Sequence, residues 1–286
     1  MDGTKIATLP LGATLLQARH LAHDQELRRL VDTLPLQEGE QAIDVPCGDG
    51  FFTQCLAERV GQTGTVAAVD LEPSVIRRGR AHQVGAGPAP RVRFCEADAS
   101  ALPFSDDSFD LAWCAHSLVS LPNAMAALRE MRRVVRPGGF VAVLGNDILH
   151  EVLLPWPPRL ELALGRAERK ACRRSGRNPR RLHVSRWLNE LVDHCGLELV
   201  DRRTCPIDRR APLSPNDEQF VTLHLKAVTR RVGDLLAAPY RRLLERLADP
   251  RSPGHMLRQR HFAMTCLDVL TLARVPLASL HRLEET

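Results

Sequence analysis

The chain has 286 residues, 44% of them hydrophobic and 26% charged, a balance that suits a large folded protein and excludes a disordered one. Its net charge of +5 comes from 39 basic and 34 acidic residues, too mild an excess to imply a nucleic-acid partner. The aromatic content of 4% also argues against a protein that stacks single-stranded bases on aromatic side chains.

The cysteines and the apolar runs indicate in which cellular compartment the protein is expected. Eight cysteines occur without a C-x-x-C pair and without a Cys/His cluster at zinc-site spacing, so we expect free, mostly buried thiols and no metal. No charged and apolar signal segment opens the chain, and no apolar run approaches the roughly 18 residues that a membrane span requires. We therefore expect a protein of the reducing cytoplasm.

Residues 1–38 are expected to form a helical segment that borders the site. Leu27, Leu30 and Val31 recur at helical spacing, and Pro35 ends the pattern. His20 and His23 lie in the same segment. We interpret them as solvent-exposed histidines, with a place at the mouth of a site as the alternative.

The next segment reads as a strand, a tight turn and the start of a helix. It has the sequence Ile43-Asp44-Val45-Pro46-Cys47-Gly48-Asp49-Gly50, followed by a helical pattern over residues 51–60. Glycine is required where the backbone takes a positive φ or where a ligand approaches closer than a Cβ allows. A turn of this kind at the carboxyl end of a strand is typical of nucleotide binding, although alone it also suits a plain strand-to-helix connection.

Four further strands alternate with helices. We predict strands at residues 65–70, 92–99 with the exit turn, 109–114 and 140–144, and helices at 73–82 and 125–135, the last closed by Arg136-Pro137-Gly138-Gly139. Short apolar runs without alternation suit strands buried on both faces, so the pattern predicts an α/β fold with a parallel sheet. Asp70 ends the second strand, where an acid accepts hydrogen bonds from ribose hydroxyls. A helix N-cap is its alternative role.

Beyond residue 150 the pattern predicts added helices around two more strands. We expect a basic helical insertion at 151–183, a sixth-strand unit at 184–213 with its strand at 197–200, a helical cap insertion at 214–260, and a seventh strand at 262–275 within residues 261–286. The basic residues of the stretch 159–181 are interpreted as a solvated face. A patch for an acidic substrate, a lipid head group or RNA phosphate is the alternative.

These motifs together resemble a known family. The relevant stretches are residues 43–50, Val69-Asp70, Glu96-Ala97-Asp98-Ala99, Leu102-Pro103-Phe104 before Ser108-Phe109-Asp110, and residues 130–139. In this order they resemble the class I S-adenosylmethionine-dependent methyltransferases, in particular the small-molecule group that includes ubiquinone and menaquinone methylases. The resemblance implies a Rossmann-like sheet of seven mostly parallel strands, helices on both faces, an antiparallel last strand, helical cap insertions, and a cofactor-binding core at 39–150.

The resemblance also implies roles for individual residues. Asp44, Cys47, Gly48 and Gly50 should surround the methionine part of S-adenosylmethionine, Asp70 the ribose, and Asp98 the adenine amino group, with Leu71 and Ala99 flanking the ring and Ala115 also at the cofactor. Pro46 departs from the glycine that the family often has and removes one amide donor, which we treat as a tolerated variant. A nicotinamide site with G-x-G-x-x-G is disfavoured, because its third glycine falls at Thr53.

The expected function is transfer of a methyl group to the oxygen, carbon or nitrogen of a small, largely apolar molecule. Candidate general bases are His116, His150 and Asp147, with His224 less favoured. One alternative is a cofactor-binding protein of this fold that does not methylate. An RNA methyltransferase ranks lower, because Ala115-His116-Ser117-Leu118 lacks the Asn/Asp-Pro-Pro-aromatic signature of base-amine methylases. The oligomeric state is left open by the sequence.

Overall fold

The computed structural model describes residues 13–83, 91–147, 150–176 and 182–277. The chain divides into two compact units, each described here by itself. The sheet unit contains the described residues of 28–145, 185–204 and 269–286, and the helical unit those of 1–27, 146–184 and 205–268. Residues 84–90, between the predicted helix at 73–82 and the predicted strand at 92–99, and residues 177–181 at the end of the basic stretch lie outside the described residues.

The strands of the described chain follow the predicted order along the sequence. They are β1 (Gln41–Asp44), β2 (Thr65–Asp70), β3 (Arg91–Glu96), β4 (Phe109–Ala115), β5 (Val135–Gly145), β6 (Val152–Leu153), β7 (Glu198–Arg210) and β8 (Ala263–Arg274). The sheet order is β3-β2-β1-β4-β5-β8-β6, with β7 also paired to β8. The first five strands are parallel and β8 is antiparallel to β5, so the predicted Rossmann-like sheet with an antiparallel last strand is confirmed. The two-residue strand β6 was not predicted.

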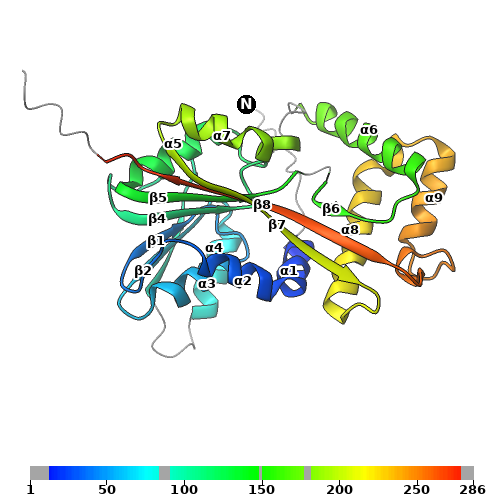
Figure 1. The fold of residues 1–286 in the computed structure, drawn as a ribbon, viewed down its shortest axis with the longest axis horizontal. Helices are drawn as coiled ribbons and strands as arrows, with labels where there is room; N and C mark the ends of the chain where they lie inside the picture. Colours follow the sequence, from blue (N-terminus) through cyan, green and yellow to red (C-terminus); the bar gives the residue numbers. More distant parts are fainter. Residues whose placement is uncertain (1–12, 84–90, 148–149, 177–181, 278–286) are drawn as a thin grey trace, which may run out of the picture. The chain divides into compact units, whose positions relative to one another are not determined.

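Helices cover both faces of the sheet unit. In chain order the described helices are α1 (Ala13–Ala22), α2 (Asp24–Asp32), α3 (Phe51–Val60), α4 (Pro73–Gln83), α5 (Ala124–Val134), α6 (Pro158–Arg174), α7 (Val184–His194), α8 (Pro215–Val232) and α9 (Ala238–Ala248). In the sheet unit α3 and α4 lie on one face, and α5 and α7 on the other (Figure 1). Strands covered on both sides explain the continuous apolar runs, such as Val66 to Val69 in β2, all of them buried.

The Arg-Pro-Gly-Gly segment differs from its prediction as a turn that closes a helix. Helix α5 ends at Val134 and β5 begins at once, with its pairing to β4 shifting between Phe109 and Leu111. Four residues therefore bulge opposite Asp110, whose Oδ1 accepts from Arg136 Nε at 2.5 Å. A Cβ on Gly139 would lie 2.7 Å from the Asp110 carbonyl oxygen, so the close approach of the backbones requires glycine.

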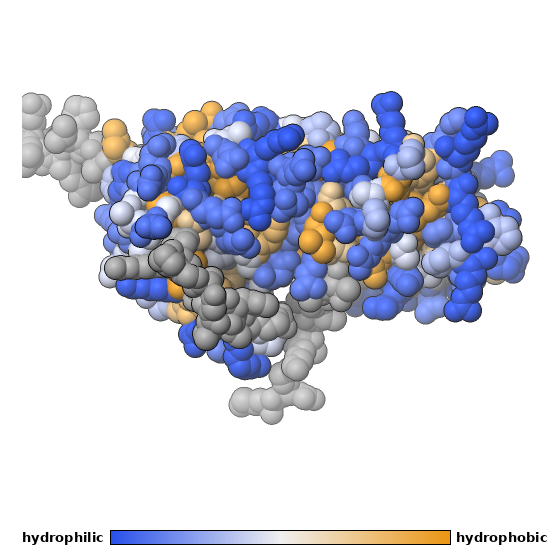
Figure 2. Space-filling view, turned by 90° about the horizontal axis from the view of Figure 1, so that it is seen from below, coloured by the Kyte–Doolittle hydropathy of each residue, from blue (hydrophilic) through white to orange (hydrophobic). Residues whose placement is uncertain are grey.

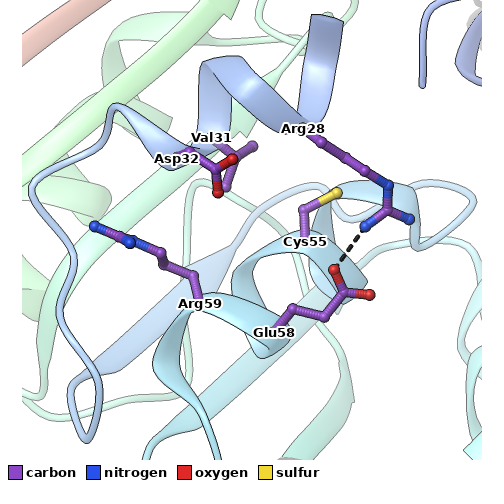
Figure 3. A pocket seen from close by; sticks show the side chains of 6 residues that line it. All are labelled: Arg28, Val31, Asp32, Cys55, Glu58 and Arg59. Carbon is purple, nitrogen blue, oxygen red and sulfur yellow. Dashed lines mark hydrogen bonds and ion pairs between the residues drawn. The ribbon is translucent and has the colours of Figure 1, made fainter. Parts of the chain in front are cut away.

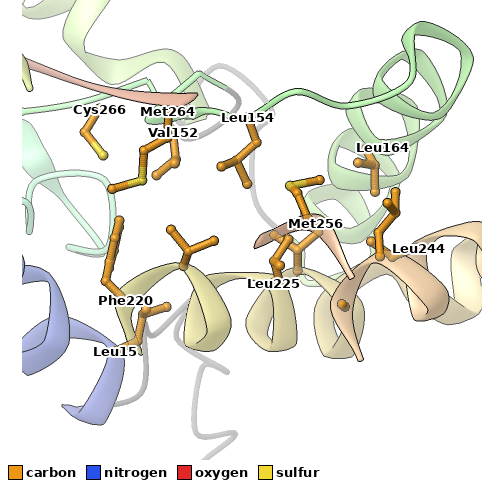
Figure 4. Packing of buried hydrophobic residues seen from close by; sticks show 14 of the residues in the cluster. Leu15, Val152, Leu154, Leu164, Phe220, Leu225, Leu244, Met256, Met264 and Cys266 are labelled. Atoms are coloured by element: carbon orange, nitrogen blue, oxygen red, sulfur yellow. The ribbon is translucent and has the colours of Figure 1, made fainter. Parts of the chain in front are cut away.

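The helical unit has its own hydrophobic core. Helix α8 supplies Phe220, Val221 and Leu225, all fully buried, and packs with α1, α6 and α9 (Figure 4). Ser214 caps α8 by accepting from the Asp217 amide, while the Asp217 carboxylate accepts from the Ser214 amide. The segments on either side of β7 thus contribute helices to one core, although they are far apart in the sequence.

The expectation that His20 and His23 are solvent-exposed is wrong. Both are buried, because α1 packs along α8 and places the His23 ring edge-on to Phe220 at 5.1 Å. Burial and the neighbouring Arg19 lower the pKa of His23 to about 3, so its ring is neutral at physiological pH. Helix α1 is short and has apolar residues on several sides, so its sequence does not distinguish a buried face from an exposed one.

The sixth strand is longer than predicted. It runs from Glu198 to Arg210, whereas the apolar signal ends at Val200. The extension contains Asp, Arg and Thr residues that alternate between exposed and half-buried positions. Polar residues of this kind suit a strand with a solvated side but read as a loop in the sequence.

The basic side chains of α6 point to solvent. Arg166, Arg169, Lys170, Arg173 and Arg174 are all exposed, as the interpretation of a solvated face expects. Figure 2 shows one side of the molecule, on which hydrophilic residues predominate and hydrophobic ones occur in small groups. All eight cysteines are free thiols, and six of them are buried.

Candidate functional site

The turn after β1, residues 45–50, is fixed by backbone hydrogen bonds to both neighbouring strands. The Val45 amide donates to the Trp113 carbonyl of β4 at 2.9 Å, and the Cys47 amide to the Val69 carbonyl of β2 at 2.8 Å. Gly48 and Gly50 have φ values of +54° and +84°, which only glycine adopts without strain. A Cβ on Gly50 would meet no atom within 4 Å, so open space lies beside this turn, hereafter the glycine turn.

Asp44, the last residue of β1, is buried without a basic partner among the contacts described. Its Oδ2 accepts a hydrogen bond of 2.6 Å from the Thr53 hydroxyl in the first turn of α3. Burial raises the pKa of Asp44 to about 8, because the ionised form loses its hydration. At neutral pH the carboxyl group is therefore mostly protonated, and it supplies polar atoms without a full charge.

Asp70 links the ends of β1 and β2. Its Oδ2 accepts from the Gly48 amide at 3.0 Å and its Oδ1 from the Glu72 amide at 2.9 Å. The two carboxylate oxygens have about four acceptor sites, and the backbone amides of Gly48, Leu71 and Glu72 occupy three of them, so acceptor capacity is left for a ligand. Burial raises the pKa of Asp70. The helix-cap alternative does not hold, since α4 begins at Pro73 and Glu72 Oε1 accepts from the Ser74 amide.

The residues expected around adenine follow the ends of β2 and β3, which are neighbours in the sheet. The Ala97 amide donates to the Asp70 carbonyl at 3.1 Å and keeps the two exits together. Leu71 is 63% exposed, while Ala99 is buried. Asp98 is exposed, and its Oδ1 accepts from both the amide and the hydroxyl of Ser100 at 2.7 Å.

The end of β4 carries Ala115, which is buried, and His116. His116 has a φ of +52°, a left-handed conformation that is uncommon for a residue with a side chain. Its amide donates to the Leu144 carbonyl of β5 at 2.7 Å, and its ring centre lies 6.1 Å from that of Phe52. A strained backbone at a strand end is typical of functional positions.

The candidates after β5 belong to the helical unit. Asp147 Oδ1 lies 2.6 Å from Nδ1 of His183, and both side chains are about four-fifths buried. His150 is exposed, with its ring centre 6.5 Å from that of His183. The structure thus brings Asp147 together with a histidine that the sequence did not indicate, while His116 belongs to the sheet unit. Asp147 and His183 are 36 residues apart in the sequence, which explains why no local motif marks this pair.

Comparison with known proteins agrees with this geometry. A family model described as a methyltransferase domain matches residues 43–143, from β1 to β5. A demethylmenaquinone methyltransferase of Staphylococcus aureus is 34% identical over 117 residues, which is 41% of this chain and 47% of that protein. The core is a class I S-adenosylmethionine-dependent methyltransferase domain. The chain spans about half the length of the curated relatives that it matches.

Solved structures share the fold over most of this chain's length. The [4+2]-cyclase SpnF has a TM-score of 0.52 and 21% identity, with 88% of this chain and 80% of that one covered. A candidate type II methyltransferase from Anaeromyxobacter dehalogenans has a TM-score of 0.54 and 23% identity, with 88% and 96% covered. At such identities the likeness shows the fold alone.

A separate hollow of about 290 Å³ lies against α2 and α3 of the methyltransferase domain (Figure 3). It is lined by Arg28, Val31, Asp32, Cys55, Glu58 and Arg59. Arg28 Nη1 and Glu58 Oε2 form an ion pair of 2.6 Å across it. None of the predicted cofactor residues lines this hollow, so it plays no part in the assignment.

Within the described part of the chain, no group of three or more histidine, cysteine, aspartate or glutamate side chains is arranged to hold a metal ion. Of the helices described, none combines the length and apolar character needed to cross a membrane.

Proposed function

We propose that this chain is an S-adenosylmethionine-dependent methyltransferase that acts on a small, largely apolar molecule. The observation that carries the proposal is the position of Asp70. Its carboxylate is anchored to the Gly48 amide and retains acceptor capacity beside the open space at Gly50. The methyltransferase domain match over residues 43–143 supports the same cofactor.

The residues present suit the groups of this cofactor. A ribose diol needs a fixed acceptor, which Asp70 offers at the tip of β2. A planar adenine needs an apolar surface, which the exposed side chain of Leu71 provides, and its amino group needs an acceptor such as Asp98. The methionine part needs a closely approaching backbone, and Gly48 and Gly50 allow that approach. Asp44, Pro46, Cys47, Ala99 and Ala115 complete the proposed site.

When bound, S-adenosylmethionine supplies a methyl group that is already activated by its sulfonium. The chain then has to position the acceptor and exclude water, which can provide most of the rate acceleration. A base is required only for an acceptor that loses a proton. We infer that His183 serves as that base, with Asp147 orienting its ring through Nδ1 and leaving Nε2 to accept the proton.

Chain connectivity keeps Asp147 close to the end of β5. Asp147 follows Gly145, the last residue of β5, by two residues, so their Cα atoms lie within about 7.6 Å whatever the arrangement of the two units. Ligands of open α/β sheets bind at this carboxyl edge. His116 at the end of β4 and His150 remain the alternative bases.

A second candidate function is a protein of this fold that carries out a different reaction. The [4+2]-cyclase SpnF, with a similar fold, is the observation that favours it. The two candidate functions differ in their products, because only a methyltransferase transfers the methyl group of S-adenosylmethionine to an acceptor.

The test is a methyl-transfer assay with S-adenosylmethionine carrying a deuterated methyl group. The first acceptor is a reduced demethylmenaquinone-type naphthoquinone, because a relative with that activity is 34% identical over part of the chain. A panel of phenols, amines and thiols follows. We expect a mass increase in one acceptor class with the wild type and a much smaller one with Asp70→Ala at the same cofactor concentration. Cofactor binding without any labelled product across the panel would favour the second candidate.

A further inference from the structure

A cavity of about 300 Å³ lies within the helical unit, between the segment around β6 and the helices α6 and α8. Its apolar wall includes Val152, Leu164 and Val228, which are buried, and the half-buried ring of Trp156, with the exposed Leu153 and Leu162 also among the lining residues. A volume of this size lies at the lower end of the range typical of small-molecule sites.

Two buried carboxylates line the cavity and differ in how they are paired. Glu168 accepts from Arg231 through both of its oxygens at 2.8–2.9 Å, so this pair is satisfied. Glu151 is 6% exposed and lies 3.6 Å from Arg19 Nη1, beyond hydrogen-bond distance. Arg19 instead donates to Asp268 at 2.6 Å. Glu151 is therefore a buried carboxylate at a cavity wall with acceptor capacity to spare.

The charge of the lining favours a cation. The acidic groups are Glu151, Glu161 and Glu168, against Arg169 and Arg231 as the guanidinium groups, which leaves an excess of one acidic group. Burial raises the pKa of Glu151, so its ionised form would be stabilised by a bound cation. Burial lowers the pKa of His224 to about 3, so this lining residue is neutral. Trp156 adds an aromatic face, and carboxylates together with indole rings are the groups that bind ammonium ions in proteins.

We propose that this cavity is a binding site for a small molecule that joins an apolar body to a protonated amine. The ammonium group pairs with Glu151, and the apolar body packs against Leu164, Val228 and Trp156. The site goes beyond the proposed methyl transfer and does not depend on it. Its binding is therefore tested in the absence of S-adenosylmethionine.

Titration calorimetry with 2-phenylethylamine tests the chemistry of the site. We expect the amine to bind at least tenfold more tightly than 2-phenylethanol, which is neutral, or 3-phenylpropionate, which is anionic. Glu151→Gln should lower the amine affinity at least tenfold. Glu161→Gln, at an exposed position of the same cavity, should leave it within about twofold.

A second variant tests the place of binding without touching the ion pairs. Gly165 lines the cavity from α6, and a Cβ there would meet only Arg169 Nη1, at 3.5 Å. A larger residue fits the helix at this position, since glycine is a poor helix former. Gly165→Leu should fill the cavity and abolish amine binding, whereas Gly165→Ala should retain it. Tighter binding of the carboxylate, or unchanged amine binding in Gly165→Leu, would overturn the proposal.

Discussion

Two buried aspartates, one in each unit, are stabilised in opposite ways. In the sheet unit, Asp44 is buried at the end of β1, and the hydrogen bond described for it comes from the Thr53 hydroxyl. In the helical unit, Asp268 is equally buried but is paired at 2.6 Å with Arg19, itself 1% exposed. Glu168 and Arg231 form a second pair of this kind in the same unit.

The presence or absence of a counter-ion distinguishes an acid at a proposed binding site from an acid that holds the fold together. An acid without a counter-ion is costly to ionise and titrates at an unusual pH, which is common at strand ends that bind ligands. A buried ion pair contributes little net stability but is strongly destabilising when one partner is removed. The sheet unit therefore should respond to pH at Asp44, and the helical unit to loss of a single arginine.

The largest expected effect concerns Arg19. Arg19→Met removes the guanidinium group that pairs with the buried Asp268, so we expect a loss of about 3–5 kcal/mol in the free energy of unfolding. Urea unfolding followed by circular dichroism measures it. Arg28→Met removes the part-exposed pair with Glu58 in the sheet unit and should cost at most about 1 kcal/mol. Equal losses in both variants would contradict the distinction between the units.

The next effect concerns the proposed role of the helical unit in methyl transfer. With an acceptor that must lose a proton, His183→Ala should lower kcat about 100-fold, with cofactor affinity unchanged and with partial rescue by added imidazole. His194→Ala is the control, since His194 is an exposed histidine bonded to the Glu190 carbonyl within α7. A normal kcat in His183→Ala would show that His183 is not the base, and His116 would then be the first alternative.

The third effect, the smallest when taken per pH unit, is a pH dependence from Asp44. Its folded-state pKa of about 8 exceeds the ordinary value of 3.8, so the folded protein holds a proton that the unfolded chain releases between these values. The stability that this group contributes is present below pH 4 and is lost as the pH rises toward 8. The slope is at most about 1.4 kcal/mol per pH unit.

Asp44→Asn tests this slope, because the amide does not titrate. The free energy of unfolding of the variant, relative to the wild type, should increase steadily from pH 5 to pH 8. Asp107→Asn replaces an exposed carboxylate of the β3–β4 connection and should run parallel to the wild type. A constant difference between Asp44→Asn and the wild type would mean that Asp44 is ionised throughout.

The sequence predicted the sheet unit well because its signals are local. Gly48, Gly50 and Asp70 lie at the ends of apolar runs, and the alternation of strands and helices fixes which ends meet. The Thr53 hydroxyl that binds Asp44 was missed, although a threonine in the first turn of the helix after the acid is a signal that could have been used.

The polar core of the helical unit could not be predicted in the same way. Arg19 and Asp268 are 249 residues apart, and neither stands in a motif. The error at His20 and His23 has the same origin, since their burial depends on α8, some 200 residues further along the chain. Such contacts arise from tertiary packing, which residue periodicity does not encode.

The most direct test of the central claim is calorimetric titration with S-adenosylmethionine. We predict one binding site in the wild type and at least about tenfold weaker binding in Asp70→Ala, since two hydrogen bonds to a carboxylate are lost. Glu58→Ala, which removes a carboxylate of α3 away from the glycine turn, should bind like the wild type. Equal affinity of the wild type and Asp70→Ala would contradict the assignment of the cofactor to the ends of β1 and β2.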